Sequence, residues 1–340
     1  MNRNEQYYRH VMGSIGAAML FFLLFFNIFG VILLLGEGIG VFSLFESYEV
    51  SKTVYQLFYA CGYTLCFMLP VPILKRLITR KKYPYYPMQA PLRATPWLLL
   101  IAPVLISLAF SASYVNSFFV DLFLFSTPAE QLAENITSYQ PLEIVLQFIV
   151  IAVVPGFCEE FLFRGAILTN CLPFGRSNAI LISALMFALM HQNPAQLFYT
   201  FVAGVLLGIV YERTRSIWNT TILHVLNNLI SLVQTVLAVN AASPAYGTLK
   251  LMLLECGLYT LGALFAVALV FRFFGKRQDF KDGIFGSVEH DLSCVPQCQI
   301  SRKRALKLFF TPCMIIFIVL VAVTVIGLLL MASIMGAVVI

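Results

Sequence analysis

Charged side chains are scarce in this sequence. Of its 340 residues only 11% are Asp, Glu, Lys or Arg, whereas 60% are hydrophobic and the mean hydropathy is +0.87. Soluble domains carry about 25% charged residues, so this composition excludes a soluble globular fold. A helix needs about 20 apolar residues to cross a bilayer, because its backbone must be satisfied within the segment. The composition therefore predicts an all-α, polytopic transmembrane bundle of about eight or nine spans.

A disulfide framework is also missing. Most of the eight cysteines lie in or beside apolar runs and have the character of small buried hydrophobic residues. Cys294 and Cys298 are the exception, because they lie in a polar segment, but their spacing is a weak metal signal and two unrelated thiols are the simpler interpretation. No internal repeat is visible, which argues against a transporter built from duplicated halves. The net charge of +6 resides in short loops between apolar runs, so no nucleic-acid partner is expected.

The apolar runs predict nine spans, and the loops between them predict their orientation. The basic clusters follow the second, sixth and eighth runs, and the acidic loops 37–49 and 121–134 follow odd-numbered runs. The positive-inside rule then places the N-terminus in the cytoplasm. A half-length or re-entrant fifth or sixth helix would change the count. The runs are Val11–Leu35, Val54–Leu74, Trp97–Val120, Leu142–Leu172, Ala179–His191, Ala195–Tyr211, Ile217–Val239, Leu251–Phe274 and Leu308–Val338.

The fourth run contains three ionisable residues in an otherwise apolar stretch: Glu159, Glu160 and Arg164. Each ionised group at a helix centre costs about 2.5 to 3.5 kcal/mol on insertion scales, so such residues face the bundle interior and mark functional sites. Glu160 and Arg164 are spaced i, i+4 and can form an intrahelical ion pair. Glu159 is rotated about 100° from Glu160 around the helix and is left available for other contacts.

Two of the four histidines lie in later apolar runs. His191 ends the fifth run, and His224 lies in the seventh, one helical turn before Asn228. A single histidine of this kind is more often a hydrogen-bonded packing residue. Two of them, together with an intramembrane glutamate, indicate a reacting site.

This set of residues is compatible with two related chemistries. In the first, Glu159 and one imidazole deprotonate a water that attacks a carbonyl, while the other imidazole and the amide of Asn228 stabilise the oxyanion. In the second, Glu159, His191 and His224 bind a zinc ion that activates the water. The residues alone do not decide between them.

These side chains can meet only if they lie at one depth in the bilayer. If the fourth helix ended near Phe157, His191 would lie about 20 Å deeper than Glu159, at a rise of 1.5 Å per residue. We therefore expect the fourth helix to continue to about Leu172, which places Glu159 near its middle. The fifth helix must then extend past His191 or start deeper than Asn178, and Pro194 offers a break beside a cavity.

The residues Glu159-Glu160-x-x-x-Arg164, Phe187-x-x-x-His191 and His224-x-x-x-Asn228 resemble, in order, the three motifs of the CPBP family. This family comprises the type II CAAX prenyl proteases and the bacteriocin-processing or immunity proteins. Each motif is short, but three in order within consecutive apolar helices form a specific signal. The resemblance covers about residues 140–240.

The resemblance implies an intramembrane endopeptidase, often described as a metalloprotease, with a buried catalytic cavity. Carried over by position, Glu159 is the catalytic base, and His191 assists it or binds metal. His224 and Asn228 form the oxyanion site, or the histidine is a further metal ligand. Glu160 and Arg164 support the site. The expected cofactor is zinc or none.

The resemblance also suggests a division of the chain. Residues 1–140 hold spans one to three, residues 141–240 the catalytic core, and residues 241–340 the last two spans with a basic cytoplasmic loop at 275–307. Expected partners are membrane lipid and a peptide or protein substrate that is lipid-modified or bacteriocin-like. The expected location is a bacterial plasma membrane. The alternatives are a non-enzymatic immunity factor and an ion- or proton-coupled transporter.

Overall fold

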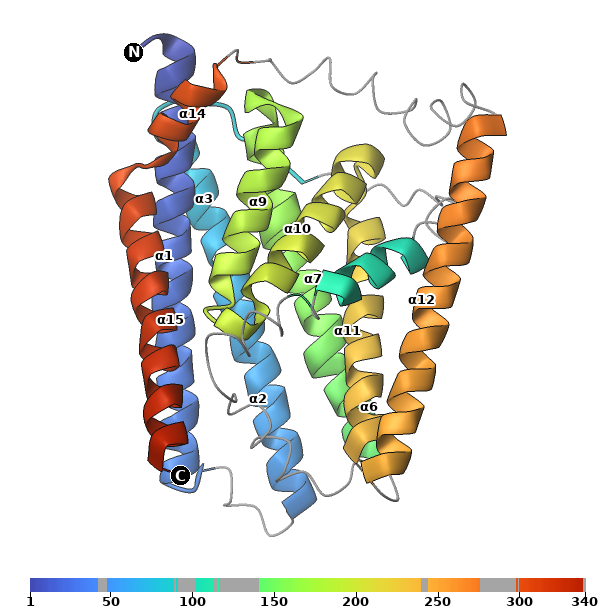
Figure 1. The fold of residues 1–340 in the computed structure, drawn as a ribbon. Coiled ribbons are helices and arrows are strands. Elements are labelled where there is room, and N and C mark those ends of the chain that lie inside the picture. Colours follow the sequence, from blue (N-terminus) through green and yellow to red (C-terminus); the bar gives the residue numbers. More distant parts are fainter. Residues whose placement is uncertain are drawn as a thin grey trace.

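The computed structural model describes residues 1–41, 48–88, 90, 102–112, 115, 141–239, 244–275, 298 and 300–338. These residues form an all-α bundle without a strand (Figure 1). Of the features expected from sequence, the acidic loop 121–134, Cys294 and most of the basic loop 275–307 lie outside the described residues. The main helices are α1 (Arg3–Gly38), α2 (Tyr48–Met68), α3 (Pro70–Thr79), α9 (Arg176–Met190), α10 (Pro194–Thr214), α11 (Ile217–Val239), α12 (Pro244–Gly275), α14 (Arg302–Phe309) and α15 (Pro312–Val338).

Seven helical segments of the described chain are long and apolar enough to cross a membrane. They confirm the predicted polytopic bundle. The fifth predicted run forms a shorter apolar helix instead, α9, and the described part of the third run contains the apolar helix Ala102–Ala112, whereas the rest of that run lies almost entirely outside the described residues. The seven segments are Arg3–Gly38, Val50–Thr79, Pro141–Phe174, Gln196–Thr214, Ile217–Leu237, Leu249–Ala268 and Pro312–Leu330.

The fourth segment is one long helix, Pro141–Phe174, as the depth argument requires. It comprises α6 (Pro141–Gln147), a π-helical stretch over Phe148–Val153, α7 (Val154–Glu160), a second π-helical stretch over Phe161–Leu168, α8 (Thr169–Cys171) and a final 3₁₀ turn to Phe174. The pair Glu159–Glu160 therefore lies between two departures from α-helical geometry, which recur at functional sites in other helices.

Helices α9 and α10 form a hairpin that enters and leaves the bundle at the same end. Arg176, the first residue of α9, is paired with Glu212 near the end of α10, with 3.0 Å between Nε and Oε1. The turn between the two helices, which begins at His191, lies well inside the bundle (Figure 1). Gly204 lets the helices approach closely, because a Cβ there would lie 3.0 Å from the Cα of Ala184. Gly204 therefore serves the packing of α10 against α9.

The hairpin resolves the depth problem. His191 follows the start of α9 by 15 residues, and Glu159 precedes the end of its own helix at Phe174 by 15 residues, so each lies about 22 Å from that end at 1.5 Å per residue. The expectation that the fifth helix extends past His191 or starts deeper than Asn178 is wrong, because α9 begins at Arg176, beside the end of the long helix, and ends at Met190. Because the hairpin returns to the end from which it started, it does not change the side on which later segments begin.

The N-terminus lies at the end of the bundle that carries the basic clusters. Arg304 of α14 is paired there with Glu5 of α1 (2.8 Å, Nε to Oε1), and α14 crosses the first turns of α1 (Figure 1). Tyr8 of α1 packs edge-on against Phe174, with ring centroids 4.9 Å apart. This end therefore collects the residues that the positive-inside rule assigns to the cytoplasm.

Candidate active site

A cavity of about 90 Å³ lies in the centre of the bundle, at the level of the α9–α10 turn. All four residues predicted to react, Glu159, His191, His224 and Asn228, line it. They come from α7, the end of α9 and α11, so segments distant in sequence converge on one space. A single water occupies about 30 Å³ in the liquid, which means that the cavity has room for about three.

Glu159 presents its two carboxylate oxygens to different surroundings. The hydroxyl of Tyr63, on α2, donates a hydrogen bond to Oε1. Oε2 has no hydrogen-bond partner among the described residues and lies 3.8 Å from Nε2 of His224. The residue is only 4% exposed, so the free oxygen depends on whatever occupies the cavity for a hydrogen bond. A buried polar atom of this kind is costly unless a water or ligand satisfies it.

Glu160 and Arg164 form the predicted ion pair, and the structure adds a partner that the spacing does not reveal. Nη1 of Arg164 lies 2.7 Å from Oε1 of Glu160, and both side chains are fully buried. The same Oε1 accepts a hydrogen bond from Nδ1 of His224 at 2.9 Å. Arg164 also donates through Nη2 to the carbonyl of Gly204 (3.2 Å) and lies 4.6 Å over the ring of Phe187. The pair thus connects α7 to α9, α10 and α11.

Both histidines have one ring nitrogen fixed by the protein. Nδ1 of His191 is 2.8 Å from the carbonyl of Phe187, and because a carbonyl only accepts, this nitrogen carries a hydrogen. Nδ1 of His224 donates in the same way to the carboxylate of Glu160. In each ring Nε2 is the nitrogen left for the cavity. Phe187 holds both rings edge-on, with centroids 5.0 Å from His191 and 5.7 Å from His224.

Asn228 is tied to the irregular part of the long helix. Pro155 has no N–H, so it cannot make the ordinary helical hydrogen bond to the carbonyl of Ile151. Nδ2 of Asn228 donates to that carbonyl at 3.2 Å, which fixes α11 against the helix just before Glu159. An amide nitrogen has two hydrogens, so one remains for a ligand in the cavity.

The sequence interpretation missed three polar residues of this region. Tyr63 holds Glu159, as described above. Asn227 and Tyr199 line the cavity and bond each other, with 2.5 Å between Nδ2 and the hydroxyl oxygen. Asn227 is a second polar residue beside Asn228 in an apolar helix, and this could have indicated its place in the site. Tyrosine is common in apolar spans, so the sequence around Tyr63 and Tyr199 does not indicate that they belong to the site.

The zinc alternative has little geometric support. Within the described ranges no three His, Cys, Asp or Glu side chains are grouped so that they could hold a metal ion. Glu159 and His224 approach each other, but His191 does not complete the set. A zinc ion bound by these three residues therefore stays a prediction.

The wall of the cavity opposite the carboxylates is apolar. It is formed by Leu206 and Leu207 of α10, Leu223 of α11, and two residues of the helix Ala102–Ala112, Leu105 and Ile106. Ser107 fixes that helix to α12 by donating to the carbonyl of Leu258 at 3.0 Å. The cavity therefore combines a carboxylate, two imidazoles and an amide with a surface suited to apolar groups.

A family model described as type II CAAX prenyl endopeptidase Rce1-like matches residues 141–230. The matched segment begins with the long helix, includes the α9–α10 hairpin and ends two residues after Asn228, so it contains every residue predicted to react. The match confirms the family resemblance inferred from the three motifs and supports a CAAX-type intramembrane protease in general. No curated protein and no solved structure matches the chain.

Proposed function

We propose that the protein is an intramembrane endopeptidase in which Glu159 activates a water held in the central cavity. The observation that carries this proposal is Oε2 of Glu159: a buried carboxylate atom with no hydrogen bond from any described residue, 3.8 Å from an imidazole nitrogen, beside a space large enough for water. A general base must lie within hydrogen-bond reach of the proton that it removes, and this geometry permits it.

In the proposed reaction, Oε2 of Glu159 takes a proton from the water while the water oxygen attacks the carbonyl carbon of the substrate. The new C–O bond places a negative charge on the carbonyl oxygen. His224 and the second amide hydrogen of Asn228 stabilise that oxyanion, and the carboxylate of Glu160 offsets the charge of a protonated His224. Nε2 of His191 orients the water. When the C–N bond breaks, the proton on Glu159 passes to the leaving amine.

The apolar wall supports a membrane-associated polypeptide as substrate, because it can bind apolar side chains or a lipid group next to the scissile bond. The substrate that we propose is a lipid-modified peptide, as the prenyl endopeptidase activity of the matching family suggests, with an unmodified or bacteriocin-like peptide as the alternative. The site is expected to function in a plasma membrane with the N-terminus in the cytoplasm.

The test is a cleavage assay on the purified full chain with two fluorogenic peptides of one sequence, one farnesylated at cysteine and one unmodified. We expect Glu159→Gln to lower turnover by about 10²- to 10⁴-fold, the range for loss of a general base. Glu255→Gln is the matched control, because Glu255 lies in the α12 segment and does not line the cavity. Turnover by Glu159→Gln at the wild-type rate would refute the assignment.

A chelator arm separates the two chemistries. The proposed mechanism predicts equal cleavage with and without the chelator, for both peptides. Loss of activity on chelation and its return on adding zinc would replace this mechanism with the metal-dependent one. Comparing the cleavage of the farnesylated and the unmodified peptide in the same assay shows whether the apolar wall recognises a lipid group.

A further inference from the structure

A second hollow lies on the opposite flank of the bundle, between α1, α3 and the start of α15. It has a volume of about 600 Å³, within the range of about 300 to 1,000 Å³ for small-molecule pockets. Its apolar part is formed by Gly13 and Ala17 of α1, Leu77 of α3, and Pro312 of α15. It shares no lining residue with the central cavity. We call it the α1–α3 groove.

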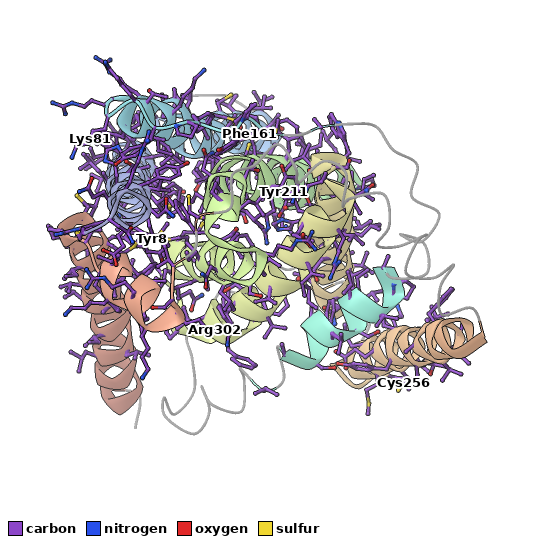
Figure 2. The ribbon with its side chains drawn as sticks, turned by 90° about the horizontal axis from the view of Figure 1, so that it is seen from above. Tyr8, Lys81, Phe161, Tyr211, Cys256 and Arg302 are labelled. Atoms are coloured by element: carbon purple, nitrogen blue, oxygen red, sulfur yellow. The ribbon has the colours of Figure 1, made fainter. Side chains whose placement is uncertain are left out.

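Cations surround the end of this groove that lies nearest the N-terminus. Arg9 and Lys81 line the groove itself and are exposed. A neighbouring hollow of about 660 Å³ shares Leu77 with it and is lined by Arg76 and Arg80. Viewed from this end of the molecule, Lys81 lies at the outer edge of the bundle, far from Cys256 of α12 (Figure 2).

The acidic residues described at this end do not neutralise the groove. Glu5 is paired with Arg304. Glu212 is paired with Arg176 on the α9–α10 hairpin. Among the described residues, the groove therefore combines an apolar floor with a positive rim whose Arg9 and Lys81 are not paired with a carboxylate.

The rim is held in place by the fold. Nε2 of His10 lies 2.9 Å from the carbonyl of Leu77 and 3.2 Å from that of Ile78, which ties α1 to the last turn of α3. Such terminal carbonyls lack helical donors, so the imidazole satisfies them. The ring of Tyr83, just beyond the turn, lies 5.2 Å from the ring of His10. These contacts fix the backbone segments that carry Arg9 and Lys81 relative to each other.

The dimensions of the groove match a lipid lying along α1. Gly13 and Ala17 follow Arg9 by four and eight residues, so the apolar floor extends about 12 Å below the cationic rim. Gly13 leaves room, because a Cβ there would meet no atom closer than 3.8 Å. A free phosphate could use the rim but not the floor. An acyl chain attached to a phosphate uses both.

We propose that the α1–α3 groove binds one anionic glycerophospholipid of the leaflet at the N-terminal end, with its phosphate between Arg9 and Lys81 and an acyl chain on Gly13, Ala17 and Leu77. Charge complementarity selects the occupant, since basic pockets between transmembrane helices bind anionic headgroups. The proposal is independent of the peptidase assignment, because no residue of the central cavity takes part.

Native mass spectrometry tests this lipid-binding proposal. The full chain is released from detergent in the presence of phosphatidylglycerol or of phosphatidylcholine with the same acyl composition. We expect one phosphatidylglycerol to stay bound where phosphatidylcholine does not. The double variant R9Q/K81Q should weaken binding about 30-fold, because two cations at about 1 kcal/mol each contribute about 2 kcal/mol and about 1.4 kcal/mol corresponds to tenfold. Gly13→Leu, which fills the floor and keeps both cations, should also lose the lipid.

The control variant R3Q/K303Q removes the same charge from exposed residues of the same end that do not line the groove. It should retain the lipid. Equal losses in R9Q/K81Q and R3Q/K303Q would show a diffuse attraction to the basic end and overturn the proposal. Displacement of the lipid by inorganic phosphate alone, or unchanged binding in Gly13→Leu, would overturn it as well, because either result removes the acyl chain from the site.

Discussion

Tyr63→Phe tests whether Oε1 of Glu159 must accept the hydrogen bond from Tyr63 for Oε2 to act as the base. The substitution removes only the hydroxyl that donates to Oε1. The ring should keep its place, because it stacks on Phe67 at a centroid distance of 4.6 Å and contacts Tyr59 at 5.9 Å. A change in rate then reports on the hydrogen bond and not on repacking of α2.

Two opposing effects decide the magnitude. A hydrogen bond to a charged group contributes about 1.5 to 3 kcal/mol, so a carboxylate freed to rotate away from its reactive orientation loses about 10- to 150-fold in rate. The opposing effect arises because the hydrogen bond from Tyr63 is weaker once Glu159 has accepted a proton, so its loss makes Glu159 a stronger base. A neutral hydrogen bond contributes about 0.5 to 1.5 kcal/mol, less than the charged one. For a proton that is half transferred in the transition state, half of the difference between the charged and the neutral hydrogen bond raises the rate about threefold. The net fall in kcat is about 5- to 50-fold.

The assay is steady-state cleavage of the peptide that the wild-type chain turns over. Tyr63 does not line the cavity, so KM should stay unchanged while kcat falls. Tyr59→Phe is the matched control, because it removes a hydroxyl one helical turn away. In a Glu159→Gln background Tyr63→Phe should add no further loss, since residues acting as one unit are not additive. An unchanged kcat, or a rise in KM alone, would refute the reasoning.

Three further predictions concern stability and reactivity. Glu160→Gln should lower the free energy of unfolding by about 3 to 5 kcal/mol in a detergent melt, because it leaves Arg164 charged and buried alone, and Glu160→Leu with Arg164→Met should recover part of the loss. Gly16→Ala should lower the melting temperature and Gly30→Ala should not, since a Cβ at Gly16 would lie 2.6 Å from the α15 backbone and one at Gly30 meets no atom within 4 Å. Partial burial raises the pKa of the Cys298 thiol, so maleimide labelling followed against pH should reach half its maximal rate above the pH of an exposed cysteine; labelling at the ordinary pH would contradict this.

Local spacing predicted the part of the site that one helix determines. Glu160 and Arg164 are four residues apart, and any helix through them places the two side chains on one face, as the 2.7 Å ion pair shows. The partner of that pair, His224, lies 64 residues further along the chain. No spacing rule connects residues across such a distance. The family motifs named His224 but not the carboxylate to which it donates.

The availability of Glu159 was predicted only in part. The rotation of about 100° from Glu160 correctly separates the two carboxylates. It could not show that a tyrosine 96 residues earlier in the chain would use one of the oxygens. Tyr63 also lies outside residues 141–230, so the family match does not point to it either. The site is thus completed by the N-terminal part of the chain, which the motifs leave unassigned.

The short fifth helix is the feature on which the chemistry depends most. Because α9 begins at Arg176, two residues after the long helix ends at Phe174, His191 lies at the same depth as Glu159. Because α9 ends at Met190 and the chain turns back, His191 sits at a helix end in the middle of the bundle, where Phe187 can accept its Nδ1 hydrogen. Irregular backbone at this depth is tolerated only beside protein or water, and this turn begins at His191, which lines the central cavity. The depth of the ionisable residues, the interrupted helix and the central space are therefore consequences of one hairpin.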